Sequence, residues 1–422
     1  YKVTGNGKDV DVEFIPEDNF LGTADGISIR RTDSNGYDTG WSTKFPNQEA
    51  NVDTVLNTMD GLYIPTVTPS DIEGVDKTST DAQGATQTGS PTFNTTLTNA
   101  NGDKIAITPS LVYPAKLVDP ATGQVTNATS VTVAGEGTYS INDATGEVTF
   151  VPEPGFTGTA KGITVSLTAP VGRDKDGTVR DEYLKTATAK YTPTVTPITI
   201  TPTDKVSEDL QNVPQTQTPT FELSNDKTAE ITGKKLVDPA TGQPTDETTV
   251  TVEGEGSYTI DPTTGAVTFT PEKDFVGTAK GVKVQATATV TNANGETATI
   301  TSDANYTPTV KAAVPTADPA TSKDIQGATQ TGTPTFAGTT VSVNGEDKEI
   351  TIKDNSYTLL DKDGNEVSST TAYAEDGTTP IGTFTIDPAT GTVTFTPTDK
   401  SYTGKVTPVK VQAESSNGIK VD

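Results

Sequence analysis

The residues in this sequence that could do acid–base chemistry are carboxylates that recur. Glu136 and Glu255 each stand between two glycines in a Gly-Glu-Gly stretch, and paired carboxylates are the groups that glycosidases use. A catalytic pair is needed once, in one cleft, whereas these acids occupy the same place in two copies of one pattern. We therefore interpret them as solvated turn residues and predict that the chain is not an enzyme and has no catalytic residue.

Two short acidic stretches have the composition of a weak Ca²⁺ loop. Asp174-Lys-Asp-Gly177 and Asp361-Lys-Asp-Gly-Asn365 place carboxylates close together beside a glycine, and such an arrangement can wrap a hard cation. Neither stretch supplies the remaining ligands of an EF-hand. We interpret both as charged hairpin turns and predict no metal-binding residue and no cofactor, with a weak calcium site as the open alternative.

Two lysines and one tryptophan offer further chemistry. Lys161 and Lys280 could form the Lys–Asn isopeptide crosslinks found in other surface sandwiches, but the equivalent position is Asp25 in the first copy and Thr407 or a neighbour in the last. A general crosslink is therefore not expected.

Trp41 could stack on a sugar face. It lies in an unrepeated insertion, so we predict local packing.

Composition excludes several classes of protein. The 422 residues contain no Cys and no His, which removes thiol nucleophiles, Ser-His-Asp triads and disulfides. The net charge of −26 repels nucleic acid and anionic lipid. No run of apolar residues approaches the roughly 20 that cross a bilayer, and no signal-type segment opens the chain. We expect a soluble segment of a longer protein.

The decisive feature is internal repetition, which defines the elements that must carry these residues. One block, a strand ending in Pro followed by an aromatic residue and Gly, occurs four times, and two shorter markers open and close the copies. The closing marker, Tyr-x-Pro-Thr-Val, falls at 63–67, 191–195 and 306–310. The blocks begin at Val12, Val148, Val267 and Val393.

The markers predict domain boundaries near residues 69, 197 and 312. Residues 1–68 would be the C-terminal part of a repeat with an insertion at about 31–60, and 69–196 and 197–311 would be complete repeats. Residues 312–422 would be a repeat that lacks its closing motif. The Pro-rich stretches 194–205 and 309–323 are predicted to be short semi-rigid linkers.

Alternation of apolar and polar residues predicts strands within each copy. Ile163, Val165 and Leu167 alternate with polar residues, and Val282 to Val290 continue the same pattern in the next copy. Between strands, Asp-Pro-x-Thr-Gly turns such as Asp261–Gly265 predict hairpins, because Asp accepts backbone N–H bonds and Gly takes the left-handed position. The count of about seven strands per copy predicts an Ig-like or fibronectin-like β-sandwich.

Aromatic residues at matching points of the block are predicted to form the cores, with exposed ligand stacking as the alternative. They are Phe150, Phe156, Phe269, Phe275, Phe395 and Tyr402. The fold prediction is therefore all-β: tandem sandwiches in series, forming an elongated rod.

Several linked motifs resemble the CshA-type fibril repeat of streptococcal and other Gram-positive wall-anchored surface adhesins. They are TGTPTF (331–336), LVDPATG (117–123 and 236–242), GEGTYSI and GEGSYTI (135–141 and 254–260), the FTGTAKG block and YTPTV. The resemblance covers nearly the whole chain except the insertion. It implies a fibrillar adhesin with an adhesive N-terminal region on a stalk of such repeats, anchored to peptidoglycan by a C-terminal signal.

The predicted function is thus a structural stalk on the cell surface that projects an adhesive tip in adhesion and biofilm formation. The alternative is a binding module, in which the repeats engage a host protein, a glycan, or the same repeats on another cell. Long Thr-rich edge strands could pair between chains in that case. A third possibility, an accessory domain of a secreted glycoside hydrolase, rests only on the occurrence of Ig-like modules there. The predicted partners are neighbouring repeats of the same chain.

Overall fold

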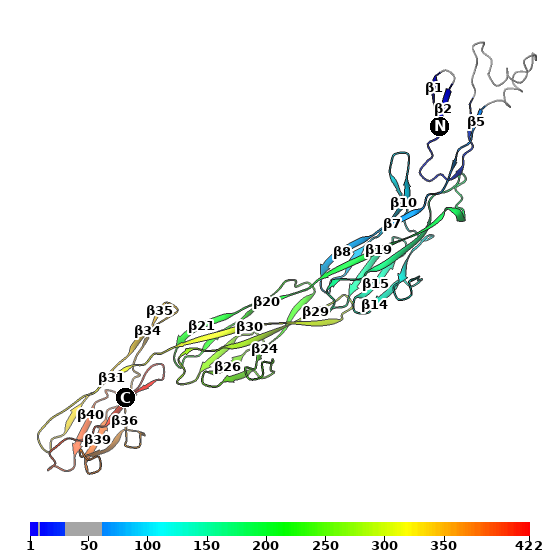
Figure 1. Cartoon of the computed structure of the whole chain (residues 1–422). Coiled ribbons are helices and arrows are strands. Elements are labelled where there is room, and N and C mark those ends of the chain that lie inside the picture. The colour runs from blue at the N-terminus through cyan, green and yellow to red at the C-terminus, as the bar shows by residue number, and fades with distance from the viewer. Residues whose placement is uncertain (7–8, 30–60) are drawn as a thin grey trace, which may run out of the picture. The chain divides into compact units, whose positions relative to one another are not determined.

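The computed structural model describes residues 1–6, 9–29 and 61–422. The described residues form β-strands and one 3₁₀ turn at Asp181–Tyr183, and Figure 1 shows the strands in successive groups along the chain. The all-β prediction is confirmed. The predicted insertion at about 31–60, with Trp41, lies outside the described residues.

The described chain divides into two compact units, each assembled from more than one stretch of sequence. The first contains Tyr1–Ile198, Asn225–Glu230 and Thr289–Thr299, and the second contains Thr199–Ser224, Ile231–Ala288 and Ile300–Asp422. Loops of the third repeat therefore belong to the first unit, and most of the third repeat belongs to the second unit together with the last repeat.

The described residues of the segment 1–68, which the sequence predicts to be part of a repeat, form short antiparallel pairs. Its strands pair as β1 (Lys2–Asn6) with β2 (Asp9–Glu13), β3 (Gly22–Thr23) with β6 (Thr66–Val67), and β4 (Ile27–Ile29) with β5 (Gly61–Tyr63).

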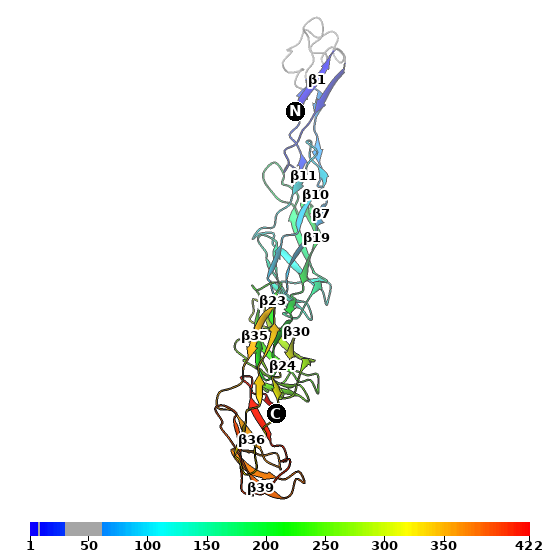
Figure 2. The same cartoon turned by 90° about the vertical axis from the view of Figure 1, so that its left-hand side faces the viewer.

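The second repeat is a two-layer sandwich with a small third sheet. One layer has the order β13 (Gln124–Val125), β12 (Ala115–Asp119), β18 (Ile163–Pro170), β19 (Leu184–Thr196), with β17 (Gly158–Thr159) and β8 (Lys77–Ala82) also on β19. The other has β14 (Ser130–Val133), β15 (Gly137–Asn142), β16 (Glu147–Pro152), β9 (Gln87–Gly89). The small sheet is β11 (Lys104–Ala106), β10 (Thr92–Thr98), β7 (Ile72–Val75), visible in Figure 2.

The third repeat has the same two layers. One is β21 (Lys205–Leu210), β30 (Thr297–Lys311), β29 (Val282–Thr291), β24 (Ala229–Val237), with β28 (Gly277–Thr278) on β30. The other is β22 (Gln215–Gln217), β27 (Val267–Pro271), β26 (Gly256–Ile260), β25 (Thr249–Val252). β20 (Ile200–Thr203) pairs with β23 (Thr220–Leu223).

The last repeat keeps one layer complete and shows a shorter version of the other. The first is β32 (Gln330–Gly332), β40 (Val393–Pro397), β39 (Pro380–Ile386), β38 (Ser369–Tyr373). The second is β37 (Glu366–Val367), β36 (Thr358–Leu360), β41 (Lys410–Glu414), β42 (Lys420–Val421). Two antiparallel pairs complete it: β31 (Thr316–Asp318) with β33 (Thr335–Ala337), and the hairpin of β34 (Thr339–Val343) with β35 (Glu346–Ile350).

In both complete repeats an early strand and the last strand lie side by side and run parallel. β8 pairs with β19 from Lys77–Tyr191 to Ala82–Thr196, and β21 pairs with β30 over the equivalent residues. Neighbouring pairs such as β12–β18, β18–β19, β22–β27 and β26–β27 are antiparallel. We call β8 and β21 the front strands, and β19 and β30 the closing strands, because the latter carry the Tyr-x-Pro-Thr-Val marker. This arrangement confirms tandem Ig-like sandwiches.

The aromatic residues of the block lie between the layers. Phe150 and Phe269 are fully buried, and Phe156 and Phe275 pack against them as partly buried neighbours. In each repeat a tyrosine packs against the buried phenylalanine, with ring centroids 4.6 Å apart for the stacked pair Tyr139–Phe150 and 4.7 Å apart for the tilted pair Tyr258–Phe269. The core prediction is confirmed for these four phenylalanines.

The Asp-Pro-x-Thr-Gly turns close the predicted hairpins. At Asp261 the side chain accepts the N–H of Thr263 at 2.8 Å, the N–H of Gly265 reaches the Asp261 carbonyl at 2.7 Å, and Gly265 has a φ of 78°. That φ lies in the left-handed region where Gly has no steric cost. Asp387–Gly391 repeats the bonds.

Exposed turn aspartates should make the protein sensitive to acid. The hydroxyl and N–H of Thr379 and the N–H of Thr378 hold the pKa of Asp376 at about 2, below its ordinary 3.8. Similar turn bonds lower the pKa values of other aspartates: Asp261, Asp361, Asp387 and Asp399. A depressed folded-state pKa stabilises the fold above the unfolded pKa, and this stabilisation is lost as pH falls through the folded value.

We therefore expect the unfolding temperature to be steady above pH about 4 and to fall between pH about 4 and 2. Thermal denaturation followed by circular dichroism against pH measures this. In the Asp376→Asn variant, the unfolding temperature should fall less steeply between pH about 4 and 2, because one of the titrating carboxylates is removed. An unfolding temperature that rises with acidification in this range would contradict the prediction.

The stretches that the sequence marks as linkers are extended, but parts of them belong to the sandwiches. Residues 194–196 end the closing strand β19, Ile198 is buried, and residues 200–203 form β20. In the second stretch, Ala313 is fully buried and residues 316–318 form β31. Only the remainder of each stretch can act as the predicted semi-rigid linker, because apolar residues inside these stretches have partners to pack against.

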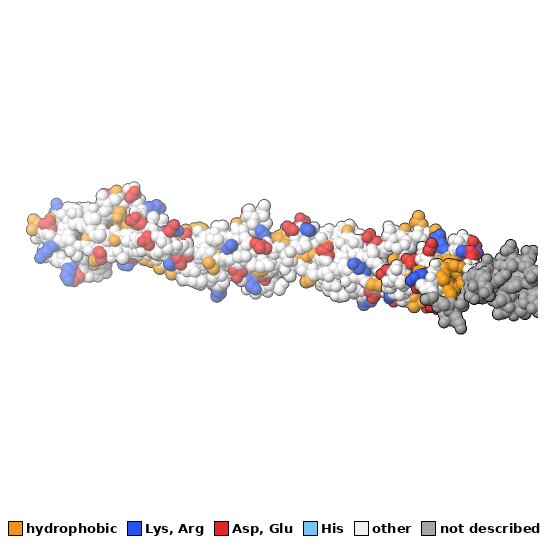
Figure 3. Space-filling view, turned by 90° about the horizontal axis from the view of Figure 1, so that it is seen from above, with side chains coloured by type: hydrophobic (Ala, Val, Ile, Leu, Met, Phe, Trp, Pro, Cys, Tyr) orange, Lys and Arg blue, Asp and Glu red, His pale blue; other side chains and the backbone are white. Residues whose placement is uncertain are grey.

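The surface is mixed in charge despite the acidic composition. On the face shown in Figure 3, acidic and basic side chains are interspersed among uncharged polar groups. Several pairs form exposed ion pairs, such as Lys235–Asp246 and Lys410–Asp422. Exposed pairs of this kind contribute little to stability.

Candidate functional site: the junctions between repeats

The carboxylates first considered for catalysis are buried in the sandwiches. Glu136 and Glu255 are each 6% exposed. Glu136 accepts the backbone N–H of Lys161 at 3.1 Å and lies 3.4 Å from the hydroxyl of Tyr139, and Glu255 accepts the N–H of Lys280 at 3.0 Å. The prediction of a solvated turn is wrong: each carboxylate ties the Gly-Glu-Gly turn of one layer to the Ala-Lys-Gly turn of the other.

This burial affects the neighbouring tyrosines. Burial, together with the charge of the nearby glutamate, raises the pKa values of Tyr139 and Tyr258 well above their usual value, so both hydroxyls stay protonated at physiological pH. The Lys280 ammonium lies 3.8 Å from Glu255, and its side chain is 84% exposed. The backbone N–H of Lys161 and both the N–H and the ammonium of Lys280 therefore contact a glutamate, and the candidate crosslink to asparagine stays a sequence-based alternative.

The two acidic stretches form hairpin turns. Asp174 accepts the N–H groups of Asp176 and Thr178 and pairs with Arg180, while Asp361 accepts those of Asp363 and Asn365. Within the described ranges, no group of three or more acidic residues is placed to hold a metal ion. In the same ranges no helix has the length and apolarity to span a membrane.

Segments far apart in sequence also meet where consecutive repeats join. A glutamine follows the front strand in each case: Gln83 after β8 and Gln211 after β21. Both glutamines are buried. Each donates from its side chain to a backbone carbonyl of the opposite layer, Gln83 to Pro154 at 2.7 Å and Gln211 to Lys273 at 3.1 Å.

Within the first unit, Gln83 also meets the loops that come from the third repeat. Its carbonyl accepts the hydroxyl of Thr228 at 2.7 Å, and its side-chain oxygen accepts the N–H of Ile198 at 3.2 Å. Beside it, Asn292 donates to the Pro152 carbonyl at 2.9 Å. Two loops of the following repeat thus satisfy backbone groups at the end of the second one.

Within the second unit, the junction between the third and last repeats combines a small apolar core with polar contacts. Hairpin β34–β35 lies beside β21 (Figures 1 and 2). The apolar core consists of Leu210, Ala313, Val343 and Ile350, each at most 4% exposed. Residues of both repeats contribute to it, so neither repeat buries it alone.

Ion pairs and hydrogen bonds surround this core. Lys348 Nζ lies 2.7 Å from Asp209 Oδ1. Asn344 donates its N–H to the Glu208 carboxylate at 3.0 Å, and this bond, with the Lys311 ammonium, lowers the pKa of Glu208. On the other side of the junction, Asn417 donates to the carbonyls of Gln211 and Ala313.

The N-terminal segment before residue 69 also contacts the second repeat. Leu21 is buried in the core of the second repeat, and its N–H donates to the Arg173 carbonyl at 2.8 Å. Asn99, in the β10–β11 turn, donates to Asp18 at 3.0 Å. At each of these three places, therefore, one turn near the end of the following repeat and a second turn or hairpin contact the residues in front. In sequence, only the recurring Gln after the front strand could have pointed to this site.

Comparison with known proteins gives one sequence-level match and several structural likenesses. The model of the "Surface adhesin CshA repetitive domain" matches residues 69–195, 197–310 and 312–422. No curated protein sequence matches the chain.

The solved structures with similar chain traces are tandem β-sandwich proteins. The I67–I69 fragment of titin is 10% identical, with 82% of this chain and 92% of that chain covered and a TM-score of 0.25. Protocadherin Gamma B7 extracellular domains 1–4 are 11% identical, with 96% of this chain and 90% of that chain covered and a TM-score of 0.26. Human CDH23 EC21-23 is 15% identical, with 82% of this chain and 95% of that chain covered and a TM-score of 0.22. With TM-scores this low, only the match to the sequence family bears on function.

Proposed function

The chain belongs to the CshA family of surface adhesin repeats, and from this membership we propose that it is a stalk segment of a bacterial fibrillar adhesin. Its repeats would hold an adhesive tip away from the cell wall, and the parent protein would be anchored to peptidoglycan in adhesion and biofilm formation. In this function the repeats do no catalysis and bind mainly one another.

The observation that supports this proposal is the construction of the junctions. A flexible string of domains needs only covalent linkers, whereas here Leu210, Val343 and Ile350 bury apolar side chains between two repeats. Each contact restricts rotation about the connection, and together they favour a fixed angle between neighbours. A spacer works only if its domains keep the tip at a distance, so stiffness at the junction is the property that this function requires.

Small-angle X-ray scattering of the whole chain tests the proposal. A compact globule of this length would have a radius of gyration of about 22 Å, and a stalk predicts at least about twice that value together with a monomeric mass. Binding to immobilised host matrix proteins or glycans, measured in parallel, should be absent. A compact particle, or saturable binding by the isolated repeats, would instead favour the binding-module alternative.

A substitution in the junction core links stiffness to the contacts described above. Leu210→Asp places a carboxylate where a side chain is 4% exposed, and loss of that burial costs roughly 2–5 kcal/mol. We expect the junction to open, with faster proteolysis of residues 312–316 and a broader distribution of distances in scattering. Val206→Asp is the matched control, since Val206 lies on the same strand and is 73% exposed. If both variants showed the same proteolysis rate and the same distance distribution, the apolar contacts at the junction would not be what holds the two repeats together.

A further inference from the structure

Every Asn-Gly pair among residues 61–422 lies in a turn that contacts the residues in front of its own repeat. The side chains of Asn99 and Asn292 make this contact from two of the turns, and Asn344 and Asn417 themselves make it from the other two. Asparagine before glycine loses its amide readily, because the glycine has no side chain to shield its backbone nitrogen. The pairs are 101–102, 294–295, 344–345 and 417–418.

Asn344 is held by the third repeat through both its backbone and its side chain. Its N–H donates to Glu208 Oε1 at 3.0 Å, and its side-chain amide donates to the Glu208 carbonyl at 3.1 Å. The carbonyl of Ser342 accepts a hydrogen bond from the Lys311 ammonium at 2.9 Å, and Val343, between the two, is 2% exposed in the junction core. Three successive residues are therefore held in place by the repeat in front.

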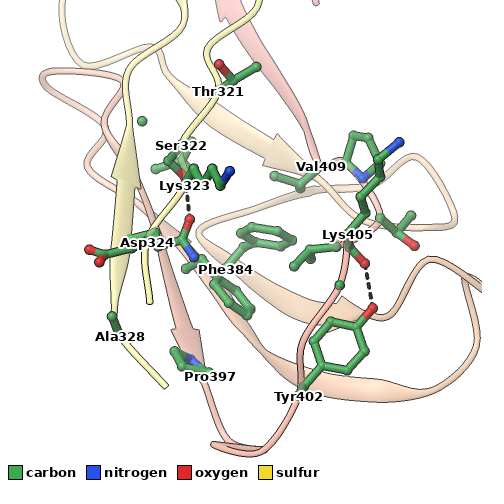
Figure 4. Close-up of a pocket in the computed structure, with 18 of the residues that line it drawn as sticks. Thr321, Ser322, Lys323, Asp324, Ala328, Phe384, Pro397, Tyr402, Lys405 and Val409 are labelled. Atoms are coloured by element: carbon green, nitrogen blue, oxygen red, sulfur yellow. Dashed lines mark hydrogen bonds between the residues drawn. The ribbon is translucent and has the colours of Figure 1, made fainter. Parts of the chain in front are cut away.

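The hairpin that carries Asn344 stands apart from the sandwich of its own repeat. In the described sheets, β34 and β35 pair with each other and with no further strand. The interior of the last sandwich lies where Figure 4 shows Phe384 between Ser322 and Val409, and the residues that line it fall within 320–334 and 384–411. A chemical change at Asn344 would therefore act on the junction and leave those sandwich contacts in place.

The geometry of the turn decides when its asparagine can react. Asn344 and Gly345 alone join β34 to β35, with φ values of 52° and 84°, and both are exposed. Nothing lies within 4 Å of a Cβ built on Gly345, so no neighbouring group crowds its backbone. The Asn344 side chain can reach the Gly345 nitrogen only by turning away from the Glu208 carbonyl. The contacts of the closed junction therefore oppose the reaction.

We propose that Asn344 is a site of spontaneous deamidation, protected while the junction between the third and last repeats is closed and reactive when that junction opens. In the reaction, the Gly345 nitrogen attacks Asn344 Cγ. A bond forms between that nitrogen and Cγ, the bond from Cγ to Nδ2 breaks, and ammonia leaves with the proton of the Gly345 N–H. Water then opens the cyclic imide at either of its carbonyls, which leaves aspartate or isoaspartate at position 344.

Either product disfavours renewed closure of the junction. The amide that donated to the Glu208 carbonyl is lost, and a new carboxylate lies near the Glu208 carboxylate, so like charges repel. Isoaspartate also adds the side-chain methylene to the main chain, in a turn whose length sets the register of the hairpin. A junction that has opened would thus stay looser. The importance of this loosening for the cell rests on the proposed stalk function, whereas the reaction depends only on the junction contacts.

The test incubates the whole chain in mildly alkaline buffer and follows each Asn-Gly peptide by mass spectrometry. Asn344 should convert at least about tenfold faster in Leu210→Asp, which opens the junction core, than in the matched control Val206→Asp, because the rate follows the open population. Asn294 is exposed in a turn of the third repeat. It should convert at the same rate in both variants, which shows that this repeat stays folded, and faster than Asn344 does in the chain without substitutions.

A second pair of variants tests the consequence with the junction core intact. Asn344→Asp carries one reaction product from the start, and proteolysis at residues 312–316 should be about fivefold faster in it through loss of one hydrogen bond. Asn294→Asp should leave that rate unchanged.

Three results would each overturn the proposal: conversion of Asn344 as fast as Asn294 in the chain without substitutions, equal conversion in Leu210→Asp and Val206→Asp, or unchanged proteolysis of Asn344→Asp. Each measurement concerns one residue or one junction, so it can fail while the scattering test of the stalk succeeds, and the reverse.

Discussion

Replacing Gly281 with alanine is expected to destabilise the third repeat by about 2–5 kcal/mol. Gly281 has a φ of +82°, and a Cβ placed on it would lie 2.4 Å from the Tyr306 carbonyl oxygen. The alanine would therefore be strained by the left-handed backbone conformation, and its Cβ would also push the closing strand away. Gly162 has the same relation to Tyr191 at 2.3 Å, so the Ala-Lys-Gly and Tyr-x-Pro-Thr-Val motifs are two halves of one contact.

A control separates these two costs. Gly254 has a similar φ of +77°, but nothing lies within 4 Å of a Cβ built there, so Gly254→Ala should lose only the backbone part, about 1–2 kcal/mol. Hydrogen exchange resolved by mass spectrometry can report the stability of the third repeat separately from the others. Equal losses in the two variants would show that close approach of the closing strand is not the reason for the glycine.

Phe269→Ala is expected to have a comparable or larger effect, a loss of roughly 3–5 kcal/mol from the same repeat. Its ring is fully buried, packs tilted against Tyr258 and meets Phe275 edge-on at 6.2 Å. With hydrophobic residues at only 31% of the chain, each core is small, and few neighbours can move to fill the cavity.

The last repeat supplies the comparison for this variant. Phe395 has the same place in the motif but is half-buried, so Phe395→Ala should cost clearly less. Urea unfolding, with hydrogen exchange to assign the transitions, measures both. A larger loss for Phe395→Ala than for Phe269→Ala would mean that burial does not set the contribution of this position.

The local features of the fold could be predicted from sequence because their causes are local. The five-residue turn Asp261–Gly265 itself supplies the hydrogen-bond donors, the acceptor and the left-handed glycine that its hairpin needs. Alternation in Ile163, Val165 and Leu167 depends only on the two-residue period of a strand, and β18 buries all three. The repetition of these signals then identified the sandwiches.

The buried glutamates could not be predicted in the same way, because their environment comes from the other layer. A Gly-Glu-Gly stretch has the composition of a solvated turn, yet Glu136 points inward to the Lys161 N–H, 25 residues away. The junctions are less predictable still. Thr228 meets Gln83 across 145 positions, and no short-range pattern encodes such a contact. The same reason applies to the Pro-rich stretches. Ala313 packs against Leu210, Val343 and Ile350, and the residues next to Ala313 in sequence do not indicate these partners.

The parallel pairing of each front strand with its closing strand has a consequence for a molecule that is pulled. When a complete repeat is stretched from its two ends, load enters one end of β8 and leaves at the opposite end of β19, so the two strands slide along each other. The hydrogen bonds between them then resist shear together, and no single bond can open first as in a zipper. A chain under fluid drag would meet that resistance in every repeat built this way.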